Sequence, residues 1–464
     1  MARPDGGRYI AMSEGGAKLP EEEGGAGRAE PAETSVRKRG AGLGRLVGHL
    51  VGGNMISMLI RLAGGVLQGR LVVPATLGLF SGFGLVLRYA PFFQLGILDG
   101  LYRELPYHVG KGERARAEEL AAAAQAWALA VGGAFAAILF GMGIGRLMHG
   151  EYWMAAGWAT TGVQSALFFY KTYYLQVTFR TSHDFSRLAL VGVVESAASF
   201  ALLALVAWLN FYGLCLRALL VGAIGTAALF AWRPLKVWPS WNPGSLLHLL
   251  KIGLPIFSVG QLYSLWSVLN ATLVLKIMGT EGMGLYAVAL MAYASIEFIP
   301  VAVRQVVYPR LAERYGKTHR IEGLVRMALK PSILTALGLV PLAGVAWHLA
   351  GPFVRLAMPA YEGAVPAMKW MLLLPVVNSF YPLASIFQVV RRQDLYAVAV
   401  GLGIAAYAVA LAWLVRGGAV LTAFPQAMIV GQAVFAASCL GFVLWLQRRE
   451  SRSEGIGKEQ GGGR

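Results

Sequence analysis

The stretch "LFSGFGLVLRYAPFFQLGILDG", Leu79–Gly100, decides the fold class of this chain. It is long and apolar enough to cross the hydrocarbon core of a bilayer, which is about 30 Å thick and needs about 20 helical residues. One cation, Arg88, lies near its middle. Because a lipid-exposed arginine at that depth is costly, Arg88 is predicted to face the protein interior or a water-filled cavity.

The rest of the chain has the same apolar character. Of its 464 residues, 56% are hydrophobic and 14% are charged, and the mean hydropathy is +0.57. A soluble protein of this size carries more surface charge. Long apolar runs separated by short polar loops predict an all-α polytopic membrane protein of about twelve transmembrane helices, because membrane-spanning strands alternate over about ten residues. The predicted spans are 44–67, 77–101, 119–144, 153–178, 187–209, 212–232, 249–277, 283–307, 328–350, 365–389, 395–415 and 420–446.

The formal net charge of +17 is interpreted as a topological signal. Lys and Arg are concentrated in the two terminal segments and in alternate loops, which the positive-inside rule places in the cytoplasm together with both termini. This distribution argues against a nucleic-acid partner. The outward loops hold few cations, namely Arg70, Arg146, Lys276, Arg355, Lys369 and Arg416.

The terminal segments are too polar to bury a core. Residues 1–42 are rich in Gly, Glu, Pro and Arg, so we expect a disordered cytoplasmic tail, and we expect the residues after Arg449 to be unstructured as well. The two cysteines, Cys215 and Cys439, fall within predicted spans, which excludes a disulfide framework.

An internal repeat predicts the architecture. Gly284-Leu285-Tyr286 lies 206 residues after Gly78-Leu79-Phe80, and Tyr308 follows Tyr102 by the same offset. The offset covers an even number of spans, so the two halves have the same orientation, as in parallel-repeat transporters. We expect two lobes of six helices around a central cavity. The predicted domains are an N-lobe at 43–232, a cytoplasmic linker at 233–248, a C-lobe at 249–447 and a cytoplasmic tail at 448–464.

Four segments resemble bacterial polysaccharide repeat-unit flippases of the multidrug/oligosaccharidyl-lipid/polysaccharide exporter superfamily. They are "GRLVVPATLGLFSGFGLVLRYAPFFQLGILDGLYRELPYHVGKGE" (69–113), "LLKIGLPIFSVGQLYSLWSVLNATLVLKIMGTEGMGLYAVALM" (249–291), "YPRLAERYGKT" (308–318) and "PAYEGAVPAMKWMLLLPVV" (359–377). One departure is Asn270, where many relatives carry an acidic residue. The resemblance implies a transporter in the bacterial inner membrane that flips polyprenyl-diphosphate-linked oligosaccharides by alternating access. It also implies membrane lipids as partners, together with the polysaccharide polymerase and glycosyltransferases of the same pathway.

Four intramembrane cations are candidate substrate-binding residues: Arg88, Arg61, Lys171 and Arg304. A guanidinium suits diphosphate oxygens, and aromatic neighbours such as those of Lys171 suit sugar rings. The alternatives are a structural ion pair for Arg88, snorkelling for Arg61 and Arg304, and helix packing for Lys171.

Three acids are candidate coupling or gating residues: Glu297, Glu195 and Asp99. Carboxylates inside a transporter can couple it to a proton or sodium gradient, and they can equally neutralise a buried cation. Because Ala294 is the repeat equivalent of Arg88, Glu297 is predicted at a depth similar to that of Arg88. We therefore hypothesise that Arg88 and Glu297 pair in one transport state, the alternative being that Glu297 pairs within its own lobe.

Enzymatic and metal-binding motifs are not evident. "YGKT" at 315–318 lacks the first glycine of a phosphate-binding loop, which is Leu311 here. The histidines show no metal-like spacing, and no cofactor is expected. The functional alternatives are a multidrug exporter of the same superfamily, whose cationic substrates would favour an acidic cavity, and a membrane glycosyltransferase or polymerase, which would carry a large catalytic loop.

Overall fold

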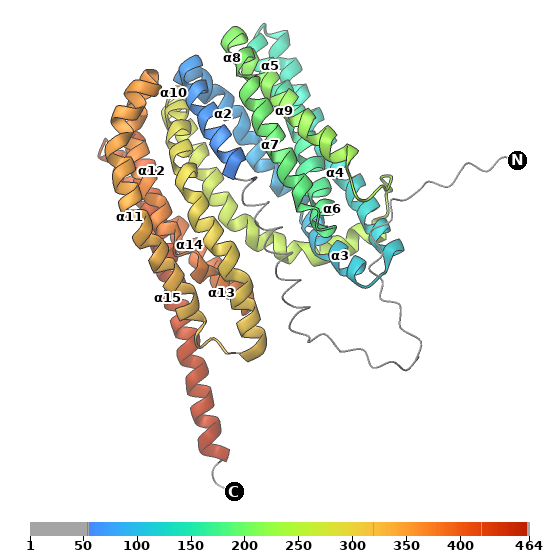
Figure 1. Ribbon diagram of the computed structural model, residues 1–464, viewed down its shortest axis with the longest axis vertical. Coiled ribbons are helices and arrows are strands. Elements are labelled where there is room, and N and C mark those ends of the chain that lie inside the picture. The colour runs from blue at the N-terminus through green and yellow to red at the C-terminus, as the bar shows by residue number, and fades with distance from the viewer. Residues whose placement is uncertain (1–52, 54, 319, 419, 462–464) are drawn as a thin grey trace, which may run out of the picture. The chain divides into compact units, whose positions relative to one another are not determined.

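The computed structural model describes residue 53 and residues 55–318, 320–418 and 420–461. All regular elements of its described part are helices, and this part contains no strand (Figure 1). Beyond residue 52 the predicted spans fall mostly on helical backbone, so the predicted fold class is confirmed. The predicted disordered tail at 1–42 lies outside the described residues.

The first half contains a helix at 55–71 and the elements that follow it up to residue 231. These are α2 (Pro74–Tyr89), η1 (Ala90–Gln94), α3 (Ile97–Gly110), α4 (Arg114–Met148), α5 (Tyr152–Phe168), the π-helix η2 (Phe169–Leu175), α6 (Gln176–Thr181), α7 (Phe185–Ala201), α8 (Leu203–Leu209) and α9 (Phe211–Ala231).

The second half begins with the longest element of the chain. Its elements are α10 (Pro243–Thr318), α11 (Leu324–Ala357), η3 (Pro359–Ala364), α12 (Val365–Asn378), α13 (Pro382–Val389), α14 (Gln393–Arg416) and α15 (Val420–Gly461). The loop predicted between 277 and 283 is reduced to a kink at Gly279, whose φ of 68° suits glycine.

Among the described helices, eight are long and apolar enough to cross a membrane, or up to nine if one bent pair is a single span. This number is below the predicted twelve because one of the eight, Gly260–Thr318, covers all of the predicted span 283–307 and most of 249–277. In addition, short distortions divide other spans, and the predicted span 44–67 lies partly outside the described residues. The segment after Arg449 was predicted to be unstructured, and this prediction is wrong: α15 continues to Gly461. Its Arg, Glu, Lys and Gln residues favour the extension, whereas Gly455 and Gly457 oppose it.

The hydrophobic core consists of two main clusters, and each includes residues from the other half of the chain. One cluster combines α3, α4, η2 and α9 with Leu246 and Leu249 from the first turns of α10. The other combines the rest of α10 with α11 to α15, and it includes Leu85 of α2. Residues 243–249, on both sides of the predicted boundary between linker and C-lobe, therefore include side chains that pack in the core of the first half.

Glycines allow α2 and α10 to approach each other at backbone distance. A Cβ at Gly78 would overlap the carbonyl oxygen of Thr280, and a Cβ at Gly284 would overlap that of Pro74. Gly78 and Gly284 are 206 residues apart, as are Pro74 and Thr280. These reciprocal contacts are what a two-fold axis between the repeats produces.

Substitution of Gly78 tests this contact. Gly78→Ala is expected to lower the free energy of unfolding by about 1–3 kcal/mol, because the added methyl overlaps backbone atoms that cannot move away. Gly84→Ala on the same helix is the matched control, since nothing lies within 4 Å of a Cβ there, and alanine favours helix over glycine. Thermal unfolding in detergent measures both. Equal melting temperatures for the two variants would contradict the close approach.

Candidate functional site

Arg88 and Asp99 lie on the two sides of a break in the second span. This span was predicted to be continuous from 77 to 101, which is wrong, because α2 ends at Tyr89 and α3 starts at Ile97. Pro91 lacks an N–H for helical bonding, and Gly96 has a φ of 86°. Arg88 occupies the last turn of α2 and Asp99 the first turn of α3, so each charge complements the helix dipole beside it.

Arg88 lines a cavity of about 120 Å³, the Arg88 cavity, together with residues of α10, α12 and α15. The described lining residues include no Asp or Glu. Apart from Arg88, the polar and aromatic lining residues are neutral. They are the aromatic residues Tyr263, Trp266 and Tyr293 and the polar residues Ser267, Asn270, Asn378 and Gln432. The cavity thus combines one cation with amides and aromatic rings.

The amides of the Arg88 cavity have hydrogen-bond partners, and Arg88 has none among the described residues. Asn270 donates from Nδ2 to the Tyr286 hydroxyl at 2.7 Å and accepts at Oδ1 from the Tyr407 hydroxyl at 2.9 Å. Gln432 donates to the Tyr263 hydroxyl at 3.1 Å. The guanidinium of Arg88 and the indole N–H of Trp266, which also has no hydrogen-bond partner among the described residues, are therefore the donors of this cavity that remain available to an anion.

Glu297 is held within the second half of the chain. Asn378 Nδ2 lies 3.1 Å from each carboxylate oxygen of Glu297 and 3.0 Å from the hydroxyl of Tyr293. No ion pair joins Glu297 to Arg88 or Arg304 in the described part of the chain. Asn378 and Tyr293 also line the Arg88 cavity, so Glu297 lies immediately behind its wall.

Arg304 lies at a separate hollow of about 420 Å³, which Tyr308, Ser385 and Gln388 also line. Its guanidinium carbon is 4.4 Å from the centroid of the Tyr381 ring, within the range of a cation–π interaction. Arg304 and Arg88 thus face different hollows.

Three of the predicted residues lie close together in the first half. Lys171 Nζ is 2.6 Å from Glu195 Oε1, and Arg61 Nε donates to the hydroxyl of Ser196, the next residue of α7, at 3.2 Å. Lys171 belongs to the π-helix η2, a distortion that is frequent at functional sites. Glu195 fills the space beside Gly225 that a Cβ would occupy. In this conformation Lys171 is neutralised by Glu195. Asp99, in turn, accepts a hydrogen bond from Gln94 at 2.6 Å.

Sequence reasoning missed the neutral members of the Arg88 cavity, above all Asn378 and Gln432. A single amide within an apolar span indicates a polar contact in the membrane. Which other span supplies the partner depends on tertiary packing, so the sequence does not show it. Arg217 was also missed as an intramembrane cation. Its Nε and a terminal nitrogen each donate to Ser199 at 2.7 Å, which indicates a structural role.

The fold is that of a membrane transporter. An outward-facing multidrug-resistance MATE transporter of the MOP superfamily has a TM-score of 0.63 at 15% identity, covering 88% of this chain and 96% of its own. An inward-facing one has a TM-score of 0.64 at 14% identity, covering 85% and 96%. A MOP superfamily transporter from Pyrococcus furiosus, whose reversed binding-pocket polarity is said to suggest a different function, has a TM-score of 0.60 at 16% identity, covering 87% and 95%.

The sequence identifies the family. A family model described as "Polysaccharide biosynthesis protein" matches residues 125–360, which is more than half of the chain. The chain belongs to this family. A search of curated proteins found no match.

The ion pair of Lys171 and Glu195 is expected to be energetically coupled. Lys171→Met and Glu195→Gln each leave one polar group without its partner in an apolar bundle, so the double variant is expected to lose less stability than the sum of the single variants, with a coupling energy of about 1–3 kcal/mol. Denaturant unfolding of the four proteins measures it. The exposed pair Arg146–Glu151 is the control and is expected to show less than about 1 kcal/mol. Additive effects at Lys171 and Glu195 would show that the pair does not stabilise this conformation.

Proposed function

We propose that the protein flips polyprenyl-diphosphate-linked oligosaccharide repeat units across the bacterial inner membrane for surface polysaccharide synthesis, by alternating access. The observation that carries the proposal is the guanidinium of Arg88, which has no hydrogen-bond or ion-pair partner among the described residues. It lies in a cavity whose described lining holds no carboxylate. An intramembrane cation that is costly to maintain marks a site for an anion.

The chemistry of the Arg88 cavity fits a sugar diphosphate. A guanidinium presents a planar fork of donors that matches phosphate oxygens. The rings of Tyr263, Trp266 and Tyr293 and the amides of Asn378 and Gln432 supply the stacking surfaces and hydrogen bonds that a sugar requires. Arg61, Lys171 and Arg304 are proposed to contact the substrate at later points of its passage through the protein. Lys171 can do so only after its ion pair with Glu195 opens.

A lateral groove fits the lipid part of this substrate. It measures about 870 Å³ and lies between the helix at 55–71 and α10, α11 and α12. Its lining is largely apolar, with Leu59, Val66, Met291, Leu342 and Phe353 among its members. A hydrocarbon chain loses no hydrogen bonds when it enters such an apolar groove, whereas a small hydrophilic substrate finds few hydrogen-bond partners there.

Near η3, at the end of the groove, hydrogen bonds between the two halves of the chain must break for the halves to separate during transport. Arg70 donates to the carbonyl oxygens of Ala357 and Leu356 at 2.7 and 3.0 Å, and the Tyr361 hydroxyl donates to the carbonyl oxygen of Val72 at 2.8 Å. These bonds join the two halves in this conformation. Glu297, Glu195 and Asp99 are proposed to couple their opening to a proton or sodium gradient. The gate between Arg88 and Glu297 then operates through Asn378, which bonds to Glu297 and lines the same cavity as Arg88.

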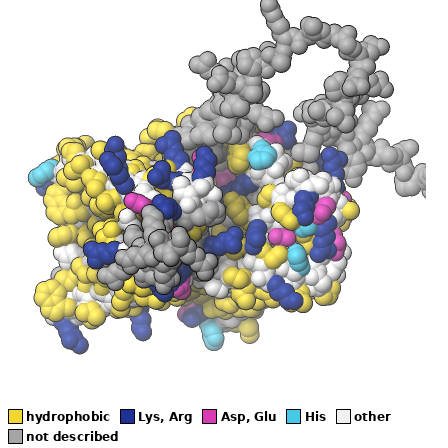
Figure 2. Space-filling model, turned by 90° about the horizontal axis from the view of Figure 1, so that it is seen from below, with side chains coloured by type: hydrophobic (Ala, Val, Ile, Leu, Met, Phe, Trp, Pro, Cys, Tyr) yellow, Lys and Arg dark blue, Asp and Glu magenta, His cyan; other side chains and the backbone are white. Residues whose placement is uncertain are grey.

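The charge distribution supports a cytoplasmic location for both termini. Figure 2 shows many Lys and Arg side chains on the face seen from below, the end of the bundle that carries α3 and α13 in Figure 1. The positive-inside rule places such a face in the cytoplasm. There the protein would receive its cargo from glycosyltransferases, and a polymerase would take it up on the other side.

The second candidate is a multidrug exporter, which the fold favours because two of the similar structures are multidrug-resistance transporters. Cationic drugs require an acidic cavity, and the described lining of the Arg88 cavity offers a cation instead. The fold, which is that of a transporter, argues against the glycosyltransferase or polymerase alternative.

Arg88 variants test the proposal. In proteoliposomes, Arg88→Ala is expected to lower the translocation rate of a fluorescent polyprenyl-diphosphate-linked oligosaccharide by about 10–100-fold, the equivalent of a charge-assisted hydrogen bond. Arg88→Lys is expected to be partly active, because a point charge replaces a fork.

The control is Arg146→Ala, which removes an arginine from an exposed pair and is expected to leave transport unchanged. All variants are compared at equal amounts of reconstituted protein. Transport by Arg88→Ala at the rate of the unmodified protein would remove Arg88 from the substrate site and the proposal with it.

A further inference from the structure

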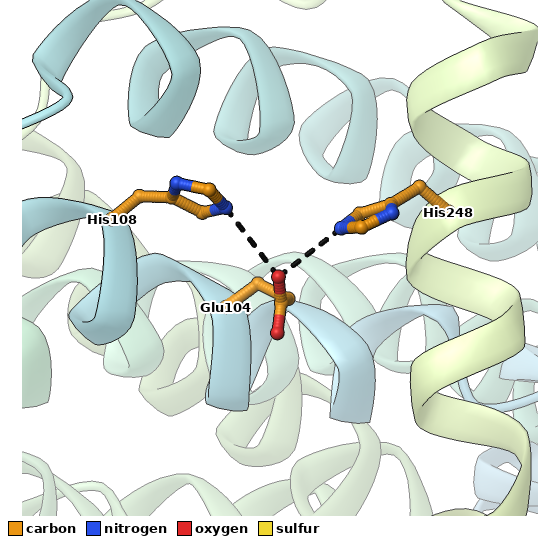
Figure 3. Close-up of side chains that lie close together, drawn as sticks. All are labelled: Glu104, His108 and His248. Carbon is orange, nitrogen blue, oxygen red and sulfur yellow. Dashed lines mark hydrogen bonds and ion pairs between the residues drawn. The ribbon is translucent and has the colours of Figure 1, made fainter.

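Two histidines converge on one carboxylate where α3 meets the beginning of α10. Glu104 and His108 lie one turn apart on α3, and His248 faces them from α10 (Figure 3). His108 Nε2 is 3.4 Å and His248 Nε2 is 3.1 Å from Glu104 Oε2, and all three ligand atoms lie within 4.8 Å of one another. The side chain of Glu104 is 9% exposed and that of His108 13%.

Backbone packing fixes this arrangement. A Cβ at Gly100 would overlap the carbonyl oxygen of Leu249, and a Cβ at Gly253 would overlap that of Gly96. The two helices therefore cross at backbone distance, one turn before Glu104 and directly beside His248. The three groups are held by the rigid part of the interface, which is the support a metal site needs.

The hydrogen bond of His108 Nδ1 to Glu113 indicates the protonation of Nε2, the ring nitrogen that faces Glu104. His108 Nδ1 is 2.5 Å from Glu113 Oε2, and since an ionised carboxylate only accepts, Nδ1 must donate. In the neutral ring, Nε2 then directs its lone pair at the carboxylate of Glu104. Two acceptors that face each other at 3.4 Å need either a proton on Nε2 or a metal cation between them.

We propose that Glu104, His108 and His248 bind a zinc ion. Atoms that ligate tetrahedral zinc at 2.0–2.2 Å lie about 3.3–3.5 Å apart, close to the 3.1 and 3.4 Å observed. Two imidazoles and one carboxylate form a zinc ligand set with a fourth position for water. Glu113 supplies the outer carboxylate that orients a ligating histidine through its other nitrogen.

The position of Glu113 follows from a left-handed turn at the end of α3. Gly112 has a φ of 78°, and the backbone N–H of Glu113 donates to the carbonyl oxygen of His108 at 3.0 Å. This is the pattern of a glycine-terminated helix end. It returns Glu113 to the ring of His108.

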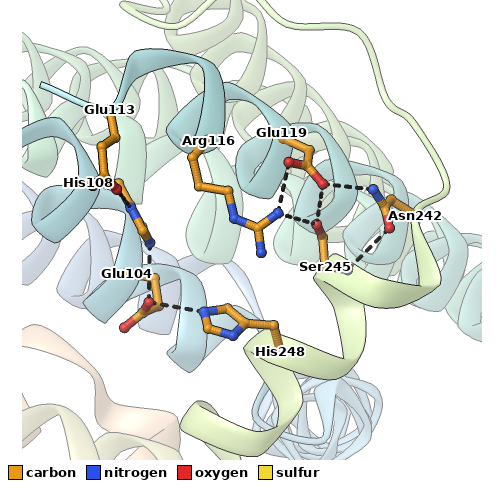
Figure 4. Close-up of polar contacts among 8 residues, drawn as sticks. All are labelled: Glu104, His108, Glu113, Arg116, Glu119, Asn242, Ser245 and His248. Carbon is orange, nitrogen blue, oxygen red and sulfur yellow. Dashed lines mark hydrogen bonds and ion pairs between the residues drawn. The ribbon is translucent and has the colours of Figure 1, made fainter.

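Zinc at this place would fasten the connection between the two halves. Figure 4 shows the adjacent network, in which Glu119 of α4 accepts hydrogen bonds from Asn242 and Ser245, both at 2.7 Å. Arg116 donates to the same carboxylate group at 2.7 Å. The network holds the first turn of α10 against α4, and zinc would hold the next turn against α3. The ion is thus a structural clamp on the segment through which α10 passes from one half to the other.

Direct binding tests the proposal. The purified full-length protein, without a histidine tag and stripped with a chelator, is titrated with zinc against a chromophoric competitor, and bound metal is measured by mass spectrometry. One zinc per chain is expected. His108→Ala, His248→Ala and Glu104→Gln are each expected to weaken binding by more than 100-fold, and Glu113→Gln by about 10–100-fold.

His149→Ala is the matched control, because His149 is exposed at the end of α4 and its loss is expected to leave one zinc bound. X-ray absorption at the zinc edge is expected to show nitrogen and oxygen ligands without sulfur. Thermal unfolding of the zinc-free variants shows that they fold. Absence of stoichiometric zinc in the unmodified protein would overturn the proposal, as would equal affinity in folded Glu104→Gln and unmodified protein. The histidines would then be only hydrogen-bond partners of Glu104.

Discussion

The architecture depends on the backbone-to-backbone approach of α2 and α3 to α10. Any side chain at Gly78, Gly284, Gly100 or Gly253 would overlap a backbone atom of the opposing helix. In a membrane, where apolar surfaces gain little by leaving lipid, close packing at small residues holds helices together. The reciprocal pairing of Gly78 with Thr280 and of Gly284 with Pro74 joins two repeats through equivalent positions. It also brings Arg88 of the first half to a cavity lined by the second.

The electrostatics of the bundle divide its ionisable groups into satisfied and unsatisfied ones. Lys171 is paired with Glu195, Arg217 is bonded to Ser199, and Glu297 accepts from Asn378. Such partners remove most of the cost of a polar group in low dielectric. Arg88 has no hydrogen-bond or ion-pair partner among the described residues, although neutral polar side chains line the cavity around it, so its guanidinium is available to a substrate.

The sequence was sufficient to predict the helical fold, because it follows from local composition. Arg88, predicted to face the protein interior or a water-filled cavity, lines the Arg88 cavity and stays exposed. Other features depend on packing over long distances. The break at Pro91 and Gly96 was not predicted because the surrounding residues are as apolar as those of a continuous span. The pairing of Lys171 with Glu195 requires η2 and α7 to be neighbours. His248 is far from Glu104 and His108 in sequence, so no spacing rule predicts a metal site. Asn378 gave no signal that it would lie against Glu297.

The most direct test is to offer one preparation of the protein two kinds of cargo. Proteoliposomes that contain the unmodified protein are assayed for translocation of a polyprenyl-diphosphate-linked oligosaccharide and for uptake of a cationic drug under the same ion gradients. A cavity with an available guanidinium and no described carboxylate predicts protein-dependent translocation of the lipid-linked sugar and no transport of the cation. Transport of the cation without movement of the lipid-linked sugar would contradict it.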